Sequence, residues 1–325
     1  MFSTKAYDRA AFTAANQARH ELTFLEPRLD LTTVALAEGA EAVCAFVNDD
    51  LAAPVIDALA DLGVTVVALR CAGFNNVDLP AAARRDITVV RVPSYSPNAV
   101  AEHTLALILA LNRRIHKAYN RVREGNFALD GLLGFNLEAK TVGVVGTGQI
   151  GRITARLLWH LRCRVLAFDP FPDAGLDELG VEYVELDDLW PASDIITLNC
   201  PLTPETHHLV DEGTISAMRS GVMLVNTGRG ALIDTVAVLD GLKRGHIGSL
   251  ALDVYEEEAS LFFEDRSQEI ITDDVFARLL TFPNVLITAH QGFFTHEALA
   301  AIAETTIASL DHLGAGLPAA NAVSA

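Results

Sequence analysis

The stretch KTVGVVGTGQIG, residues 140–151, carries the clearest structural signal in the chain. Its first part, Thr141 to Val145, is a short Val-rich run typical of a buried parallel strand. Glycines at the spacing G-x-G-x-x-G follow without interruption, and a segment with apolar residues at helical spacing, 153–161, comes after them. This order predicts a strand, a tight turn and the N-terminus of a helix.

Each glycine of this turn has its own physical role. Gly146 permits the tight turn, Gly148 has no Cβ to keep the backbone from a pyrophosphate, and Gly151 lets the helix pack close to the strand. The helix N-terminus supplies N–H groups and a positive dipole end. The spacing alone also occurs in ordinary turns. Here a second apolar run, Arg164 to Phe168, ends in Asp169, about 20 residues on, where a carboxylate meets a ribose diol. The stretch therefore predicts a dinucleotide site.

Asp169 also bears on which dinucleotide is bound. Its carboxylate can accept a hydrogen bond from a ribose 2′-OH and repels a 2′-phosphate. The residues that follow it, Pro170 to Pro172, include no arginine that could hold such a phosphate. We expect NAD rather than NADP.

The composition limits the classes of function. A chain of 325 residues, half of them hydrophobic, can form two globular domains. The formal net charge of −18 argues against nucleic acid or an anionic membrane as partner. The longest apolar run, Leu105 to Leu111, is too short to span a bilayer, and the N-terminus lacks the apolar core of a signal peptide. The cysteines have no metal-ligand spacing, so we expect reduced thiols in the cytoplasm and no metal. These cysteines are Cys44, Cys71, Cys163 and Cys200.

Both halves of the chain alternate apolar runs with amphipathic segments, which predicts parallel sheets covered by helices. A Pro/Ser-rich break begins at Val92, and a long helix is expected from Ala99 to about Arg123, so we place a domain boundary there. A last helix, His296 to Leu313, is expected to return to the first domain. The expected strands are 22–25, 42–47, 64–69, 87–92, 141–145, 164–168, 194–198, 222–225, 249–254 and 285–288.

Three polar residues stand just after predicted strands of the second half, at the sheet edge where open α/β sheets bind ligands. They are Arg229 in NTGRG, Glu258 in DVYEEE and His290 in TAHQGFF. Each taken singly could be an ordinary surface or loop residue. Together, beside a dinucleotide loop, they supply a carboxylate binder, an acid/base and a group that orients it.

Several motifs in order resemble the D-isomer-specific 2-hydroxyacid dehydrogenases, and within that family the fermentative D-lactate dehydrogenases. The resemblance rests on RCAGFNNVDL, RVPSYSPNAVAEH, GTGQIG, NTGRGALID, ALDVYEEE and the histidine of TAH. It implies an α/β fold of two Rossmann-like, doubly wound parallel-sheet domains, with the substrate domain split around the NAD domain. The implied ranges are 1–98 for the substrate domain, 99–293 for the NAD-binding domain and 294–325 for the returning helix.

The resemblance also implies roles for residues. Arg229 binds the substrate, His290 donates the proton and Glu258 is its partner, which stabilises the imidazolium. The implied cofactor residues are Gly146, Gly148, Gln149, Ile150, Gly151, Asp169, Cys200, Pro201, Thr206, Thr227 and Asp253. The implied substrate side is Ala72, Gly73, Asn75 and Tyr95, and Phe293 is a candidate for limiting substrate size. Family members often have Pro before the histidine and this chain has Ala289, but the imidazole is retained.

The expected reaction is reversible hydride transfer between NADH and pyruvate, which gives D-lactate. Another small 2-ketoacid (glyoxylate, hydroxypyruvate or 2-ketobutyrate) is an alternative substrate, and a non-catalytic NADH-sensing protein is an alternative of another class. Formate dehydrogenases of this architecture have Gln where this chain has Glu258, which argues against that activity. The resemblance also implies a homodimer or homotetramer paired through the region from Leu105 to Asn136.

Overall fold

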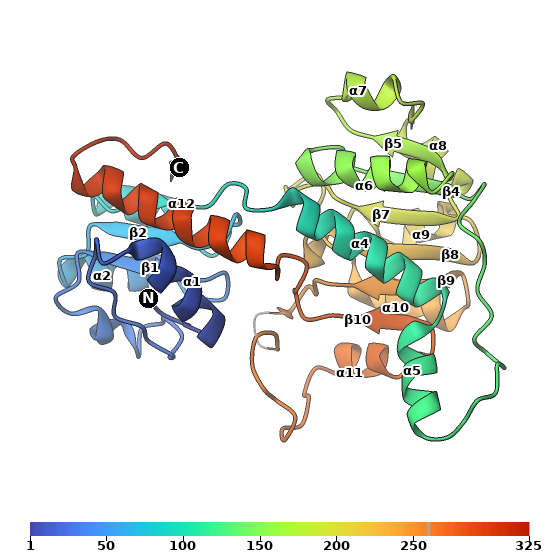
Figure 1. Cartoon of the computed structure of the whole chain (residues 1–325), viewed down its shortest axis with the longest axis horizontal. Helices are drawn as coiled ribbons and strands as arrows, with labels where there is room; N and C mark the ends of the chain where they lie inside the picture. Colours follow the sequence, from blue (N-terminus) through green and yellow to red (C-terminus); the bar gives the residue numbers. More distant parts are fainter. Residues whose placement is uncertain (259–260, 325) are drawn as a thin grey trace. The chain divides into compact units, whose positions relative to one another are not determined.

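The structure is a computed structural model that describes residues 1–258 and 261–324. It divides into two compact units (Figure 1). Unit 1 comprises Met1–Ser96 and Phe293–Ala325, and unit 2 comprises Pro97–Gly292. The expected boundaries at residues 98 and 293 lie within two residues of these divisions. Across the described residues, no helix has both the length and the apolar character needed to cross a membrane.

Among the described residues of unit 2, seven strands form one parallel sheet in the order β10-β9-β8-β7-β4-β5-β6. The chain starts in the middle at β4, builds outward through β5 and β6, and then crosses over to β7. This is a doubly wound order, with its switch point between β4 and β7. The strands are β4 (Thr141–Val145), β5 (Arg164–Phe168), β6 (Glu182–Tyr183), β7 (Ile195–Leu198), β8 (Val222–Asn226), β9 (Ile247–Leu252) and β10 (Val285–Ile287).

Helices cover both faces of this sheet, because successive side chains of each strand point to opposite faces. In β8, Met223 and Val225 pack in one core with α4 and α6, whereas Val222 and Leu224 pack in another with α8 to α11. The helices are α4 (Pro97–Asn112), α5 (Ile115–Arg123), α6 (Gln149–His160), α7 (Ala174–Asp177), α8 (Leu186–Ala192), α9 (Glu212–Ala217), η2 (Gly230–Leu232), α10 (Thr235–Lys243) and α11 (Asp274–Leu280). Burial on both faces explains why the strands read as continuous apolar runs.

The single long helix expected from Ala99 to Arg123 is wrong. The structure has two helices there, separated at Arg113 and Arg114. Arg114 has φ +52°, a left-handed conformation that ends α4 and redirects the chain into α5. The apolar periodicity continues across the break, so the sequence pattern did not reveal it.

Unit 1 has, in its described part, a four-stranded sheet in the order β1-β2-β3-β11, with β11 antiparallel to β3 and the other pairs parallel. Helix α12 packs against α1 and β2 (Figure 1). The strands are β1 (Ala42–Ala45), β2 (Val66–Leu69), β3 (Thr88–Val90) and β11 (Ala322–Val323). The helices are α1 (Ala6–Asn16), η1 (Val34–Ala37), α2 (Ala53–Asp61), α3 (Leu79–Arg84) and α12 (His296–Gly314).

The strand expected at Leu22–Leu25 is also wrong. This segment is irregular, and Leu25 exchanges backbone hydrogen bonds with Met1 and Thr4 at 2.8 and 2.9 Å. Phe2 in turn donates to the carbonyl of Cys44 in β1 at 3.0 Å. The first residues of the chain therefore take the place beside β1 that the apolar run was expected to fill.

Candidate active site

The turn between β4 and α6 is shaped by its glycines. Gly146 has φ +90°, and a Cβ there would lie 2.6 Å from the backbone nitrogen of Cys200. At Gly151 a Cβ would lie 1.9 Å from the carbonyl oxygen of Gly146, so no side chain fits. A Cβ on Gly148 would meet no protein atom within 4 Å, so the residue that precedes α6 borders open space. The first turn of α6 can therefore present its N–H groups to an anion there. It contains the predicted cofactor residues Gln149 and Ile150.

Asp169, directly after β5, connects the glycine loop to the loop after β5 through hydrogen bonds of its carboxylate. Its Oδ2 accepts a hydrogen bond from the backbone nitrogen of Thr147 at 2.6 Å, and its Oδ1 accepts from that of Phe171 at 2.8 Å. Thr147 is held further by the Tyr183 hydroxyl, which donates to its Oγ1 at 3.0 Å. The carboxylate thus lies half-buried beside the glycine loop, at the carboxyl end of the neighbouring strand.

The predicted cofactor residues Cys200, Pro201 and Thr206 lie in the loop after β7. The hydroxyl of Thr206 donates to the carbonyl of Pro201 at 2.7 Å and accepts from the backbone nitrogen of Thr203 at 2.8 Å, which closes the loop on itself. Burial raises the pKa of the Cys200 thiol to about 11, so it is neutral at physiological pH. After β8, Thr227 is buried and its hydroxyl lies 2.8 Å from that of Thr104.

Arg229 follows β8 on a loop that its neighbours hold in place. The side-chain nitrogen of Asn226 donates to the Arg229 carbonyl at 2.8 Å, and Arg229 Nη1 donates to the carbonyl of Gly228, also at 2.8 Å. A Cβ on Gly230 would lie 2.1 Å from the carbonyl carbon of Tyr255. Only glycine permits this approach, and it brings the Arg229 loop against the loop that leads to Glu258.

Glu258 and His290 form a hydrogen-bonded pair between the loops after β9 and β10. Glu258 Oε1 lies 2.7 Å from His290 Nδ1, and both side chains are 16% exposed. The second carboxylate oxygen, Oε2, accepts from the backbone nitrogen of Tyr255 at 3.0 Å. With Nδ1 bonded to a carboxylate, the proton on that nitrogen is held and the ring plane is fixed. Nε2 is then the nitrogen suited to proton exchange.

Asp253, just after β9, organises the loop that carries His290. Its backbone carbonyl accepts from the nitrogen of His290 at 2.7 Å, and its carboxylate accepts from those of Gln291 and Gly292, each at 2.9 Å. The carboxylate also accepts from Thr288 Oγ1 at 2.6 Å and His103 Nε2 at 3.2 Å. Burial alone would raise the pKa of Asp253, but the hydrogen bonds from His103, Thr288 and Gly292 outweigh it and lower the pKa to about 2.

This centre holds His290 in an uncommon conformation. His290 has φ +51°, in the left-handed region that a non-glycine residue adopts at a cost. Asp253 accepts hydrogen bonds from the backbone nitrogens of His290, Gln291 and Gly292, and these bonds stabilise that conformation. With the backbone held in this way, the imidazole lies within hydrogen-bond distance of Glu258.

The sequence reasoning missed several of these supporting residues. His103 lies on α4, on the same stripe as the buried Val100, Thr104, Leu107 and Leu111, so an ionisable residue on a largely apolar face was the available signal. Thr288 and Gly230 had no sequence signal of this kind, because their roles depend on distant segments.

The predicted substrate-side residues belong to unit 1. Ala72 and Gly73 follow β2, where Arg91 Nη1 donates to the Ala72 carbonyl at 2.8 Å and Cys71 Sγ donates to the Gly73 carbonyl at 3.2 Å. Asn75, in the same loop, is exposed. These bonds hold the loop as a defined turn.

Tyr95 and Phe293 belong to an aromatic cluster of unit 1. The Phe293 ring lies 6.2 Å from that of Tyr95, 6.4 Å from that of Phe46 and 6.0 Å from that of Phe294. Phe294 also contacts Tyr7 edge-to-face at 4.8 Å and is half-exposed, so it is not a core residue. The substrate-side candidates of unit 1 are thus grouped into one loop and one aromatic cluster.

Comparisons with known proteins bear on the whole chain. A family model described as D-isomer specific 2-hydroxyacid dehydrogenase, NAD binding domain, matches residues 105–292. The D-lactate dehydrogenase of Escherichia coli is 52% identical over 317 residues, which cover 97% of this chain and 96% of that protein. The solved structure of the pyruvate reductase of Chlamydomonas reinhardtii superposes with a TM-score of 0.94 at 46% identity, covering 98% of this chain and 97% of that one. A D-lactate dehydrogenase from Aquifex aeolicus, solved with NAD and lactic acid, has a TM-score of 0.86 at 33% identity, covering 97% and 95%.

Proposed function

The chain belongs to the D-isomer specific 2-hydroxyacid dehydrogenase family, and from that premise we propose that it is an NAD-dependent D-lactate dehydrogenase that interconverts pyruvate and D-lactate. The observation that carries the proposal is the Glu258–His290 pair at 2.7 Å, in the loops at the carboxyl ends of two strands of the NAD binding domain. A histidine held by a carboxylate is the acid/base that reduction of a ketone requires. Among the relatives that share about half of this sequence, those from Escherichia coli and Curvularia clavata are named D-lactate dehydrogenases, and others are named 2-hydroxyacid dehydrogenases.

NAD fits the residues that surround the glycine loop. The open space at Gly148 lies before the helix N-terminus, where a pyrophosphate is favoured, and the Asp169 carboxylate lies beside the same loop. The remaining cofactor residues in the proposal follow neighbouring strands of the same sheet. They are Gly146, Gln149, Ile150, Gly151, Cys200, Pro201, Thr206, Thr227 and Asp253. When bound, NADH supplies the hydride for C2 of the ketoacid.

The proposed catalytic residues divide the remaining work. The planar guanidinium of Arg229 pairs with the substrate carboxylate, which a lysine's point charge cannot reproduce. His290 gives a proton from Nε2 to the carbonyl oxygen as negative charge develops there, and takes it back in the oxidative direction. Glu258 holds Nδ1 and stabilises the imidazolium. On the substrate side we propose Ala72, Gly73, Asn75, Tyr95 and Phe293.

The proposal is tested by assaying the oxidation of NADH with a panel of 2-ketoacids. Chiral analysis then identifies the enantiomer of the product. We expect pyruvate to be the best substrate, 2-ketobutyrate to be weaker, and the product to be D-lactate. An added methylene changes the barrier by only about 1–3 kcal/mol, so the preference should be graded. L-lactate as product would overturn the assignment. Binding of NADH without turnover of any 2-ketoacid would instead support a sensor.

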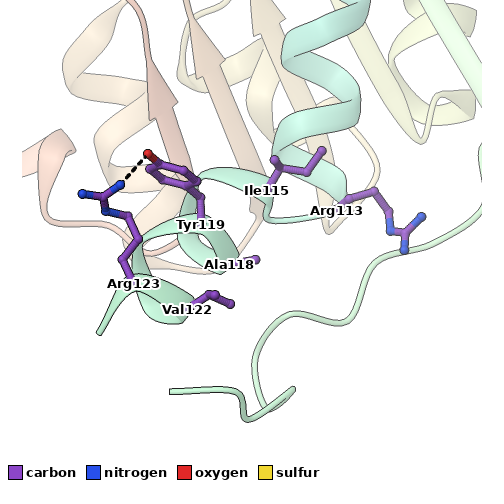
Figure 2. A pocket seen from close by; sticks show the side chains of 6 residues that line it. All are labelled: Arg113, Ile115, Ala118, Tyr119, Val122 and Arg123. Carbon is purple, nitrogen blue, oxygen red and sulfur yellow. Dashed lines mark hydrogen bonds between the residues drawn. The ribbon is translucent and has the colours of Figure 1, made fainter. Parts of the chain in front are cut away.

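We also propose that the chain forms a homodimer or homotetramer through the region from Leu105 to Asn136. Leu107, Ile108 and Leu111 pack in a core of unit 2, so the proposed contact lies in residues 113–135, where several large apolar side chains are exposed. Helix α5 has no buried residue among those described, and Leu133 is 93% exposed. Figure 2 shows a pocket on this segment, lined mainly by the apolar parts of Arg113, Ile115, Ala118, Tyr119, Val122 and Arg123. Exposed apolar surface of this extent is typical of an interface between protein chains.

Light scattering on Leu133→Asp tests this assembly. The variant should shift toward the monomer mass, whereas Leu161→Asp, the same change at a leucine that follows α6 and is 39% exposed, should keep the assembly. A wild-type protein that is monomeric at micromolar concentration would contradict the proposal.

For the compartment we propose the cytoplasm, since the four cysteines, all within the described residues, form no disulfide.

A further inference from the structure

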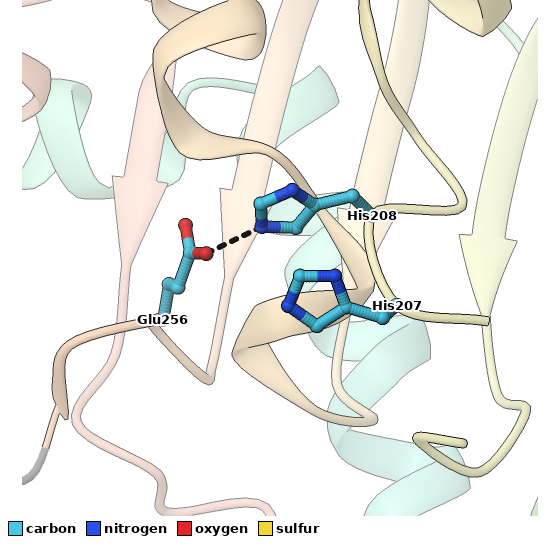
Figure 3. Close-up of side chains that lie close together, drawn as sticks. All are labelled: His207, His208 and Glu256. Carbon is cyan, nitrogen blue, oxygen red and sulfur yellow. Dashed lines mark hydrogen bonds and ion pairs between the residues drawn. The ribbon is translucent and has the colours of Figure 1, made fainter. Parts of the chain in front are cut away.

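His207, His208 and Glu256 form a cluster in unit 2 with no role in the reaction proposed above (Figure 3). The histidines lie between β7 and α9, and Glu256 lies in the loop after β9. One possible metal-ligand atom from each residue lies within 4.8 Å of the others. The sequence reasoning considered metal ligands only among the cysteines and passed over this pair.

The backbone brings the two imidazoles together. Side chains of consecutive residues diverge in a helix or a strand. His208 instead has φ +51°. Its imidazole ring stacks on that of His207, with the ring centroids 4.0 Å apart and an angle of 28° between the ring planes. Hydrogen bonds fix this turn, since His207 N donates to the Thr203 carbonyl at 2.9 Å and His208 N donates to the Ala231 carbonyl at 2.8 Å. The stacked pair is therefore a feature of the fold and not of one mobile side chain.

Glu256 is held so that it faces these rings. Its Oε2 accepts a hydrogen bond from Thr235 Oγ1 at 3.0 Å, and its Oε1 lies 2.5 Å from His208 Nε2 (Figure 3). The glutamate and His208 are both partly buried, whereas His207 is exposed to solvent. A carboxylate oriented by a hydrogen bond on its second oxygen is the arrangement that supports a metal ligand.

We propose that His207, His208 and Glu256 bind a divalent transition-metal ion of the Zn²⁺ class. Two imidazoles and one carboxylate are a ligand set that Zn²⁺ accepts, with water in the fourth position. Imidazole nitrogens disfavour Mg²⁺ and Ca²⁺, which select oxygen ligands. Ligands at about 2.0–2.1 Å from a tetrahedral ion stand roughly 3.4 Å apart. Oε1 and Nε2 must therefore separate by about 1 Å, and the exposed His207 ring must turn to converge on the ion.

Metal binding here would connect three segments of unit 2: the loop after β7, the start of α10 through Thr235, and the loop after β9. Glu258 lies two residues beyond Glu256 in the last of these. The bound ion should therefore stabilise the loop that carries the proposed partner of His290. An ion that binds only the folded chain also raises the melting temperature.

Calorimetric titration of the chelator-treated, cofactor-free protein with Zn²⁺ alone tests the site. We expect about one equivalent to bind to the wild type. Because His207 is exposed, His207→Ala should fold normally and lose tenfold or more in affinity. Thr235→Val, which removes the hydroxyl that supports Glu256 and keeps the weaker backbone contact, should lose roughly tenfold in affinity. His160→Ala removes an exposed imidazole of α6 outside the cluster and serves as the matched control, with unchanged affinity.

Two further measurements distinguish metal binding at this cluster from binding at a cysteine or at the His290–Glu258 pair. Co²⁺ should show visible absorption without the near-ultraviolet band that a cysteine thiolate ligand adds. His290→Gln should leave the affinity unchanged, because His290 belongs to the other pair. Absence of binding to the wild type, equal affinity in His207→Ala, or loss of binding in His290→Gln would each overturn the proposal. None of these outcomes depends on whether pyruvate is reduced.

Discussion

The His290–Glu258 pair and the His103–Asp253 pair are built differently, although both lie in unit 2 and both take their carboxylate from the loop after β9. Glu258 is 16% exposed, and apart from His290 its carboxylate accepts from the backbone nitrogen of Tyr255. Asp253 is 2% exposed and accepts from His103, Thr288, Gln291 and Gly292. A carboxylate whose two oxygens together accept hydrogen bonds from several groups fixes the position of the backbone around it. A carboxylate with few donors besides its histidine can stabilise a positive charge that develops on that histidine.

This difference suggests a division of labour that can be tested. The Asp253 centre should determine whether the His290 loop is formed, and the Glu258 pair should determine what its imidazole does. Changes at His290 should then reduce turnover with little loss of stability, whereas changes at the Asp253 centre should first reduce stability.

The largest effect is expected from His290→Gln. Removal of the proton donor should lower kcat by roughly 10²–10⁴-fold while NADH binding is largely kept. Steady-state reduction of pyruvate gives the first quantity, and quenching of protein fluorescence by NADH gives the second. Near-normal turnover in the folded variant would refute the assignment of His290.

The next effect concerns Asp253 and pH. Its folded-state pKa of about 2 lies below the ordinary value of 3.8, so its ionised form stabilises the fold. That contribution, about 2 kcal/mol, is fully present above pH 4 and is lost as the pH falls through the range between these two values.

Urea unfolding of the wild type and of Asp253→Asn at neutral and acid pH measures this contribution. The variant should be less stable at pH 7, and the difference should shrink as the pH approaches 3. A difference that stays constant over this range would mean that the charge of Asp253 does not contribute.

A smaller effect is expected from His103→Phe, which removes one donor from a carboxylate that keeps others. Loss of one hydrogen bond to a charged group should cost about 1.5 kcal/mol of unfolding free energy, the low end of the usual range, because the other donors remain. Turnover should fall less than tenfold, in contrast to His290→Gln. His103→Gln, which can still donate, should recover part of the stability. If His103→Phe instead matched the catalytic loss of His290→Gln, the division between the two pairs would be wrong.

The smallest change is expected at a third carboxylate, Asp169, which we propose contacts the cofactor directly and therefore extends the comparison. Asp169→Ala should weaken NADH binding and narrow its advantage over NADPH by about tenfold, because repulsion of a 2′-phosphate is lost. Since Asp169 also accepts from Thr147 and Phe171, Asp169→Asn is the control that keeps an acceptor without the charge. Equal use of both cofactors by the wild type would contradict the argument.

Local patterns predicted much of unit 2. The strands Thr141–Val145 and Arg164–Phe168 have the predicted bounds, and Asp169 lies beside the glycine loop as the spacing indicated. These features depend on a few neighbouring residues, namely an apolar run that needs burial and a turn that needs glycine. Local patterns failed where a competing segment decided the outcome. Leu22–Leu25 is not a strand because the N-terminal residues bond beside β1, and the break at Arg114 leaves no mark on the apolar periodicity.

The sequence by itself thus determined the family, the doubly wound α/β fold and the loops in which polar groups gather, because strand, turn and helix signals are short-range. Only the tertiary structure decided that His103 and Thr288 meet at Asp253 and that Glu256 faces His208. His103 lies 150 positions from its acceptor, and Glu256 lies 48 from the histidine. Such pairs depend on the order in which parallel strands assemble, which places the ends of distant segments at one edge of a sheet.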